Sequence, residues 1–153
     1  MFLLTILSCA PAKVDFVVSD LRCEYLPEPI GIEARSPRLS WKMGTETQGA
    51  FQSDYQIQVA TSNSLLEKNL PDLWDSGIVK SECSSQVDYK GKELNPGMKV
   101  FWRVRIRNQQ HNTSDWSKTA NWEMGLLSEV LWQAKWIGAP ESVNTGNWKL
   151  PGT

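Results

Sequence analysis

The sequence predicts an all-β fold, an antiparallel sandwich of about seven strands. Short segments alternate between apolar and polar residues with a period of two, and clusters of turn-forming residues separate them. No segment with helical periodicity exceeds about two turns, which disfavours the α and α/β classes. With 153 residues, 41% of them hydrophobic, the chain suits one domain that can bury a core without a metal or cofactor.

The clearest alternation lies in residues 15–26, 37–44, 52–61 and 98–108. A strand with one apolar face lies with that face on a core. The residues expected on the core are Leu39, Trp41, Met43, Tyr55, Ile57, Val59, Val100, Trp102, Val104 and Ile106. The residues expected on the opposite faces include Gln56, Gln58, Ala60 and a basic stripe of Arg103, Arg105 and Arg107 beside Phe101. Acidic neighbours across the strands, or docking of another domain, would explain this stripe.

Three further segments complete the set of about seven strands: residues 73–80, with a bend at 75–77, residues 86–89 and residues 116–124. Residues 64–69 are expected to form a single helical turn in a connection. At 94–97, Pro96 fixes φ and Gly97 supplies a positive φ, which predicts a tight turn. Short alternating strands with frequent turns are typical of a fibronectin type III or immunoglobulin-like antiparallel β-sandwich.

Charge and cysteine content exclude several functions. The formal net charge is −1, so nothing favours nucleic acid, whose phosphates require a basic surplus. The three cysteines show no CxxC spacing, and we expect no metal and no cofactor. Cys23 and Cys83 are expected to be buried free thiols, with a disulfide between them as the alternative. His111, the only histidine, lies in a polar loop and cannot support a triad or a multi-histidine metal site.

Residues 1–13 are interpreted as a truncated lipoprotein-type signal, with a disordered apolar stub as the alternative. An apolar run of about eight residues ends in Ile6-Leu7-Ser8-Cys9, which is similar to a bacterial lipobox. Cys9 is therefore the lipidation candidate, and the protein would be exported, periplasmic or anchored in the outer membrane. The run is too short to span a bilayer, which takes about 20 residues, so contact with the membrane would be through the lipid alone.

Nine short motifs follow one another in an order typical of one family. They are LRCEY (21–25), PIGI (29–32), PRLSW (37–41), QSDYQIQV (52–59), LWDSG (73–77), YKG (89–91), FWRVR (101–105), SDWS (114–117) and WQAKWI (132–137). Across residues 18–138 the chain resembles the N-terminal fibronectin type III-like domain of large bacterial α-L-rhamnosidases. The resemblance implies further β-sandwiches and an (α/α)₆ barrel after this domain. In the family that barrel hydrolyses the terminal rhamnoside with inversion, so no catalytic residue is carried over to this chain.

The resemblance implies a non-catalytic accessory module at residues 14–126 that supports packing between domains of a glycosidase acting on rhamnose-containing glycans. Residues 127–153 would be a linker or the truncated start of a following domain. The alternative is a free-standing surface module for carbohydrate binding or adhesion. The partners would be downstream domains of the same polypeptide, with glycans as a further possibility. One position departs from the pattern: Val100 stands where a corner tyrosine is usual, which removes a hydrogen bond of about 1 kcal/mol.

Three tryptophans are candidates for a platform that holds a sugar or a neighbouring domain: Trp74, Trp132 and Trp136. Trp74 lies between Asp72 and Asp75, a combination that suits sugar binding. The structural alternative is that Trp74 packs over the sandwich edge while Asp75 caps the following turn. Three nearby acids, Glu24, Glu28 and Glu33, flank a Pro/Gly-rich loop and are expected to be solvated loop charges.

Overall fold

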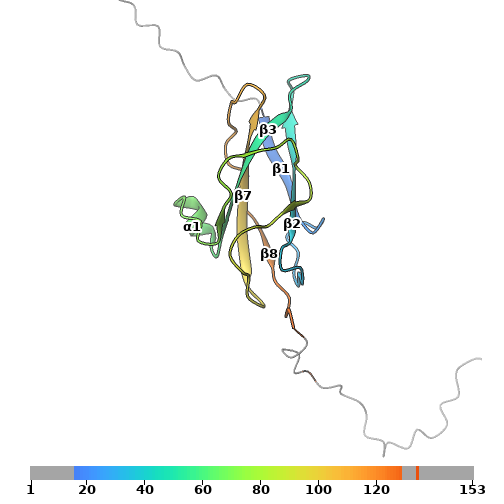
Figure 1. The fold of residues 1–153 in the computed structure, drawn as a ribbon, viewed down its shortest axis with the longest axis vertical. Helices are drawn as coiled ribbons and strands as arrows, with labels where there is room; N and C mark the ends of the chain where they lie inside the picture. Colours follow the sequence, from blue (N-terminus) through green and yellow to red (C-terminus); the bar gives the residue numbers. More distant parts are fainter. Residues whose placement is uncertain (1–15, 129–133, 135–153) are drawn as a thin grey trace, which may run out of the picture.

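The computed structural model describes residues 16–128 and Ala134 (Figure 1). Residues 16–128 contain eight strands and one short helix. The strands and helix are β1 (Phe16–Cys23), β2 (Arg38–Thr45), β3 (Gln52–Ala60), α1 (Asn63–Glu67), β4 (Trp74–Asp75), β5 (Val79–Lys80), β6 (Val87–Asp88), β7 (Lys99–Asn108) and β8 (Ala120–Glu123). The helix is too short to cross a membrane, and no other helix occurs among these residues.

The strands form two antiparallel layers, which confirms the predicted sandwich. One sheet has the order β1-β2-β6 and the other β4-β3-β7-β8, with β5 also paired to β3. The expected count of about seven becomes eight because residues 73–80 form two short strands, β4 and β5. Gly77 lies between them with φ +59°, so the chain bends away from β3 and returns to it.

The core lies between the layers, and the central pair β3 and β7 supplies seven of its buried apolar residues. Tyr55 faces Ile106, and Val59 faces Trp102 in their register. Trp102 is fully buried and Trp41 is 3% exposed, which confirms both as core residues. Each large apolar side chain buried in this way contributes about 1.5–3 kcal/mol to stability.

The outer face of β3 differs from the expectation. Gln58 and Ala60 are buried although the alternation placed them on a polar, outward face. The reason is α1, which lies on the side of the five-stranded sheet that faces away from β1 and β2 (Figure 1). Its Leu66 is fully buried, so this short helix gives part of the outer face a cover of its own.

Backbone hydrogen bonds join the connection between β1 and β2 to the outer edge of β8 and so link the two sheets. The amides of Gly31 and Ile32 donate to the carbonyl of Glu123 at 3.0 and 2.9 Å, and Gly125 donates to the carbonyl of Ile32 at 2.7 Å. Gly31 has φ +82°, a conformation that favours glycine. The connection between β1 and β2 therefore closes the outer edge of β8 at residues 123–125.

The two cysteines of the described region are both free, so the disulfide alternative is wrong. Cys23 is buried as expected, and burial raises the pKa of its thiol to about 12. The expectation of burial is wrong for Cys83, which is exposed. The carbonyl of Cys83 accepts a 2.9 Å hydrogen bond from the buried side chain of Gln52, so its loop is held against the sandwich while the thiol faces outward.

Val100 cannot make the hydrogen bond of a corner tyrosine, but Tyr89 makes a similar bond from its hydroxyl to the backbone. Val100 is fully buried, and Gly97 has the expected positive φ of +67° in the turn before it. The hydroxyl of Tyr89 donates a 2.8 Å hydrogen bond to the carbonyl of Lys92, two residues before Leu94. A phenol thus ties down the backbone ahead of the turn, although it belongs to the segment before the turn rather than to β7.

Candidate functional site

Trp74 lies on the edge strand β4, where its half-buried ring packs edge-on against Tyr89 with centroids 5.4 Å apart. The carboxylate of Asp72 accepts hydrogen bonds from the amide and hydroxyl of Thr61 at 2.8 and 2.7 Å. The carboxylate of Asp75 accepts one from the amide of Gly77 at 2.9 Å. Trp74 therefore packs on the sandwich edge and Asp75 caps the following turn, as the structural alternative expected. A sugar-binding role for Trp74 stays a prediction.

A shallow depression of about 510 Å³ surrounds Trp74. It is lined by Pro71, Asp72, Leu73, Trp74, Asp75, Lys90, Gly91 and Lys92. Burial pushes the pKa of Asp72 up, but hydrogen bonds from Thr61 outweigh it, and the pKa lies below its ordinary value. The depression thus presents an ionised carboxylate that is already bonded to protein. The other two platform candidates, Trp132 and Trp136, and the lipidation candidate Cys9 lie outside the described residues.

None of the three arginines on the outer face of β7 bonds directly to an acid: Arg103 and Arg105 donate to side-chain amides, and Arg107 donates to the hydroxyl of Thr113 at 3.2 Å. Arg103 donates through Nε and Nη2 to Oε1 of Gln58 at 3.1 and 2.7 Å. Arg105 does the same to Gln56 at 3.0 and 2.7 Å. The strand register sets these pairs, because Gln58 stands opposite Arg103 and Gln56 opposite Arg105. The expectation of acidic partners is therefore wrong for the direct contacts.

Asp75 stands behind the two glutamines and completes this network. Its carboxylate accepts from Nε2 of Gln56 at 2.7 Å and from Nε2 of Gln58 at 2.9 Å. Burial pushes the pKa of Asp75 up, but these bonds and that from Gly77 outweigh it, so the pKa is lowered. Each glutamine amide thus donates to the Asp75 carboxylate through its nitrogen and accepts from one arginine through its oxygen, so one network links the carboxylate to both guanidinium groups.

Trp116 covers the arginines from the other side. The guanidinium carbons of Arg103 and Arg105 lie 4.3 and 4.6 Å from the centroid of its ring, within the range of cation–π attraction. The alternation predicted a strand over residues 116–124, but β8 begins only at Ala120, and Trp116 lies before it on the outer sheet face. Matching two-residue spacings of Gln in β3 and Arg in β7 are the signal that could have revealed this network.

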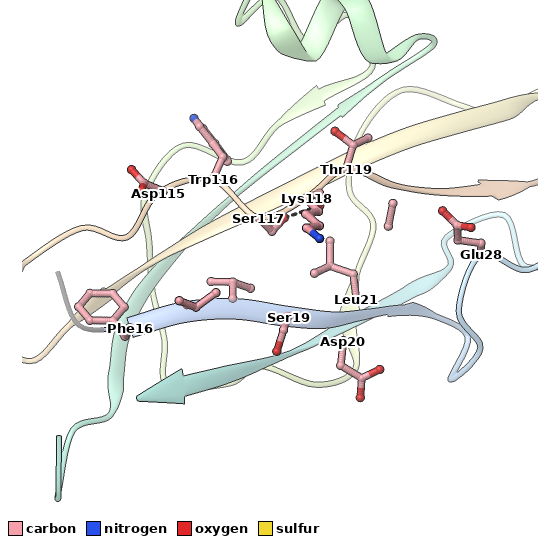
Figure 2. Close-up of a pocket in the computed structure, with 13 residues that line it drawn as sticks. Phe16, Ser19, Asp20, Leu21, Glu28, Asp115, Trp116, Ser117, Lys118 and Thr119 are labelled. Carbon is pink, nitrogen blue, oxygen red and sulfur yellow. Dashed lines mark hydrogen bonds between the residues drawn. The ribbon is translucent and has the colours of Figure 1, made fainter. Parts of the chain in front are cut away.

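A groove of about 890 Å³ lies between β1 and residues 115–120, where the edges of the two sheets face each other. Figure 2 shows Leu21 directed from β1 toward Ser117 and Lys118, with Phe16 at one end and Glu28 at the other. Trp116 points away from β1, toward the arginines. The groove was missed by the sequence analysis because alternation within one strand does not reveal which sheet edges face each other.

Of the three acidic loop residues, Glu24 and Glu28 make hydrogen bonds, and Glu33 is exposed. Glu24 bonds the guanidinium of Arg38 at 2.7 Å, and hydrogen bonds from Arg38 lower the pKa of this carboxyl. Glu28 accepts a 2.7 Å hydrogen bond from Nδ2 of Asn121. The exposed His111 lies 3.6 Å from Asp54. Within residues 16–128 no cluster of three or more metal-ligating side chains occurs.

These features define an immunoglobulin-like antiparallel β-sandwich. The sequence model of the family described as "Rha78A-like, N-terminal immunoglobulin domain" matches residues 18–128. The chain belongs to this family. The family resemblance carried by the order of the short motifs is thereby confirmed.

The relatives are much longer proteins. An α-L-rhamnosidase from Streptomyces avermitilis is 44% identical over 117 residues, which are 76% of this chain and 11% of that protein. One from an Alteromonas species is 45% identical over 120 residues, 78% of this chain and 13% of that protein. The crystal structure of a Streptomyces avermitilis α-L-rhamnosidase complexed with L-rhamnose matches with a TM-score of 0.78 and 42% identity, over 82% of this chain and 12% of that chain. The chain thus corresponds to the N-terminal immunoglobulin domain of glycoside hydrolases and not to their catalytic part.

Proposed function

We propose that this domain is a non-catalytic packing module of an α-L-rhamnosidase that acts on rhamnose-containing glycans. The match to the N-terminal immunoglobulin domain of that family, over 11–13% of the length of the relatives, carries the proposal. On this view residues 14–126 are the module, and residues 127–153 lead into a following domain. The module contributes surface and rigidity, and the chemistry belongs to downstream domains of the same polypeptide.

The surface of the described residues supports a packing role. Several apolar side chains are exposed, including Ile30 at 80% and Val17 at 67%. The groove beside β1 and the outer sheet face around Trp116 offer further contact area. Contacts between domains of one chain use surfaces of this mixed kind.

Two measurements test the proposal. The first is the sequence of the gene beyond codon 153, which should encode the remainder of an α-L-rhamnosidase. The second compares the full-length product with a deletion of residues 16–128. We expect the deletion to lower the melting temperature of the remaining protein and to leave hydrolysis of p-nitrophenyl α-L-rhamnoside in place. Loss of all activity in a still-folded deletion protein would contradict a non-catalytic role.

A second candidate function, a free-standing module for carbohydrate binding or adhesion, rests on Trp74. Its ring is half-buried beside an open depression with two lysines at the rim. Titration of the 153-residue chain with L-rhamnose and with a rhamnosylated glycan, followed by tryptophan fluorescence, tests it. A saturable change that disappears in Trp74→Ala would favour this second function over the packing module.

The location of the protein also remains a proposal. The lipobox-like Ile6-Leu7-Ser8-Cys9 supports export and attachment of a lipid to Cys9 in a bacterium. The domain would then be held at the periplasmic or outer-membrane surface by that lipid.

A further inference from the structure

One edge of the three-stranded sheet has no pairing strand among residues 16–128. β1 pairs with β2 alone, so every second residue of β1 directs its N–H and C=O groups toward the groove. On the opposite wall, residues 115–119 precede β8 and lie outside the named strands. The groove is therefore bounded by two backbone segments rather than by side chains alone.

The free edge of β1 lacks the usual protection against pairing. Its first four residues, Phe16-Val17-Val18-Ser19, include neither a charge nor a proline, and Val17 is 67% exposed. Exposed edges are normally blunted by lysines, prolines, bulges or a covering segment. The irregularity in β1 begins only at Asp20, which has φ +50° and interrupts the register with β2. We therefore expect another segment to pair with the free backbone groups of β1 in the assembled protein.

The groove fits one extended segment. A straight edge of four residues is about 13 Å long at about 3.3 Å per residue, and the groove volume is about 890 Å³. Apolar atoms of Leu21 and Ala120 line it. Its charged lining residues are three acids and one base, a net negative set: Asp20, Glu28, Asp115 and Lys118. A short apolar strand with a basic residue near its end would complement both the lining and the charge.

We propose that this groove receives, by strand addition to β1, an extended segment of the same polypeptide that lies beyond residue 153. The inference rests on the proposed function, under which most of the protein follows this domain, since the chain spans 11–13% of the length of its relatives. A tethered segment reaches the groove at a high effective concentration without a second molecule. Pairing of β1 with β1 of a second copy would instead bring two sets of the same carboxylates together.

A photo-crosslinking experiment on the full-length product tests the proposal. Residue 17 is replaced by p-benzoylphenylalanine, and crosslinked peptides are identified by mass spectrometry. We expect a crosslink within one polypeptide, from position 17 to a peptide beyond residue 153. The matched control carries the same probe at Leu70, which is 59% exposed and lies outside the groove, and should not give that crosslink. A crosslink to residues 1–15, a crosslink to a second copy, or none at all overturns the proposal.

Hydrogen exchange provides an independent measurement. The amides of Phe16–Ser19 that face the groove should exchange about tenfold or more faster in the 153-residue chain than in the full-length product. Val17→Lys should remove this difference, and Leu70→Lys should preserve it. Equal exchange in both proteins, or loss of protection in both variants, contradicts strand addition.

The two proposals fail in different ways. If deletion of residues 16–128 destabilises the remaining enzyme while position 17 gives no crosslink, the strand addition is wrong and the packing module stands. If the gene encodes no rhamnosidase beyond codon 153, both are wrong.

Discussion

The hydroxyl of Tyr89 donates a 2.8 Å hydrogen bond to the carbonyl of Lys92. The ring of Tyr89 is 2% exposed and packs edge-on between Trp74 and Trp122, at centroid distances of 5.4 and 6.0 Å. One residue thus joins the aromatic core to the backbone that leads into the turn before β7. Burial raises the pKa of this phenol to about 12, so the hydroxyl keeps its proton well above neutral pH.

Tyr89→Phe should destabilise the domain by about 1 kcal/mol, because it removes one hydrogen bond and keeps the ring. Urea denaturation of the 153-residue chain measures the change. Tyr25→Phe is the matched control, since Tyr25 is 51% exposed, and we expect no measurable effect. Equal stability of Tyr89→Phe and the unsubstituted chain would show that the bond contributes nothing net.

Gly91→Ala should cost about 1–3 kcal/mol through overpacking. A Cβ atom at this position would lie 2.6 Å from Cβ of Trp74 and even closer to the hydroxyl of Tyr89. Gly44→Ala is the control, because the new Cβ would meet only the carbonyl oxygen of Val17, at an ordinary 3.7 Å. Thermal unfolding should show a lower midpoint for Gly91→Ala alone. A similar loss in both variants would refute the steric explanation.

Trp116→Ala should lower the free energy of unfolding by about 1–2 kcal/mol, because two guanidinium groups lose their aromatic partner. Urea denaturation checks this. Lys118→Ala changes an exposed neighbour and should leave stability within about 0.5 kcal/mol of the unsubstituted chain. A neutral result for Trp116→Ala would mean that the glutamines and Asp75 hold the arginines without the ring.

Stability should fall as the pH rises from about 9 toward 12. Burial, with a smaller contribution from the charge of Glu24, raises the pKa of Cys23 from 9.0 to about 12. Because the pKa in the folded state is above that of the unfolded chain, the contribution is complete below pH 9 and is lost as the pH approaches 12. Cys23→Ala should be less stable at neutral pH yet lose less on alkalinisation, with Tyr89 still contributing a decline. Cys83→Ala should retain the full decline, since Cys83 is exposed.

The full chain produced in a bacterium should incorporate labelled palmitate at Cys9. Cys9→Ala should abolish the label and release the protein from the membrane fraction. Cys83→Ala, which also removes a thiol, should retain it. Label that persists in Cys9→Ala, or is absent from the unsubstituted chain, would rule out the lipobox interpretation.

Alternation within single strands was enough to place the core. Ile57, Val104 and Trp102 all face inward as expected, because a period of two admits only one buried face. The same argument failed at Gln58, where α1 covers a face that the pattern assigned to solvent. Packing of a helix on a sheet face is tertiary structure, and the local alternation of residues does not reveal it.

The surface sites were harder to foresee for a similar reason. The contacts of Arg103 depend on its register with β3, which sets Gln58 opposite it. The groove depends on the approach of β1 to residues 115–120, which are far apart in sequence. Trp74 was singled out as a platform candidate, with packing over the sandwich edge as the alternative. The hydrogen bonds from Thr61 to Asp72 join residues 11 positions apart, which composition cannot reveal.

The described domain begins at one end of the sandwich with β1 and leaves it at the opposite end after β8 (Figure 1). Its longest strand, β7, has 10 residues and therefore measures about 33 Å. The bonds of Gly31 and Ile32 to Glu123 fasten the two layers near the exit, so the layers cannot slide past each other easily. The sandwich is thus a stiff spacer of about 3 nm, which fixes how far anything attached before residue 16 stands from anything attached after residue 128.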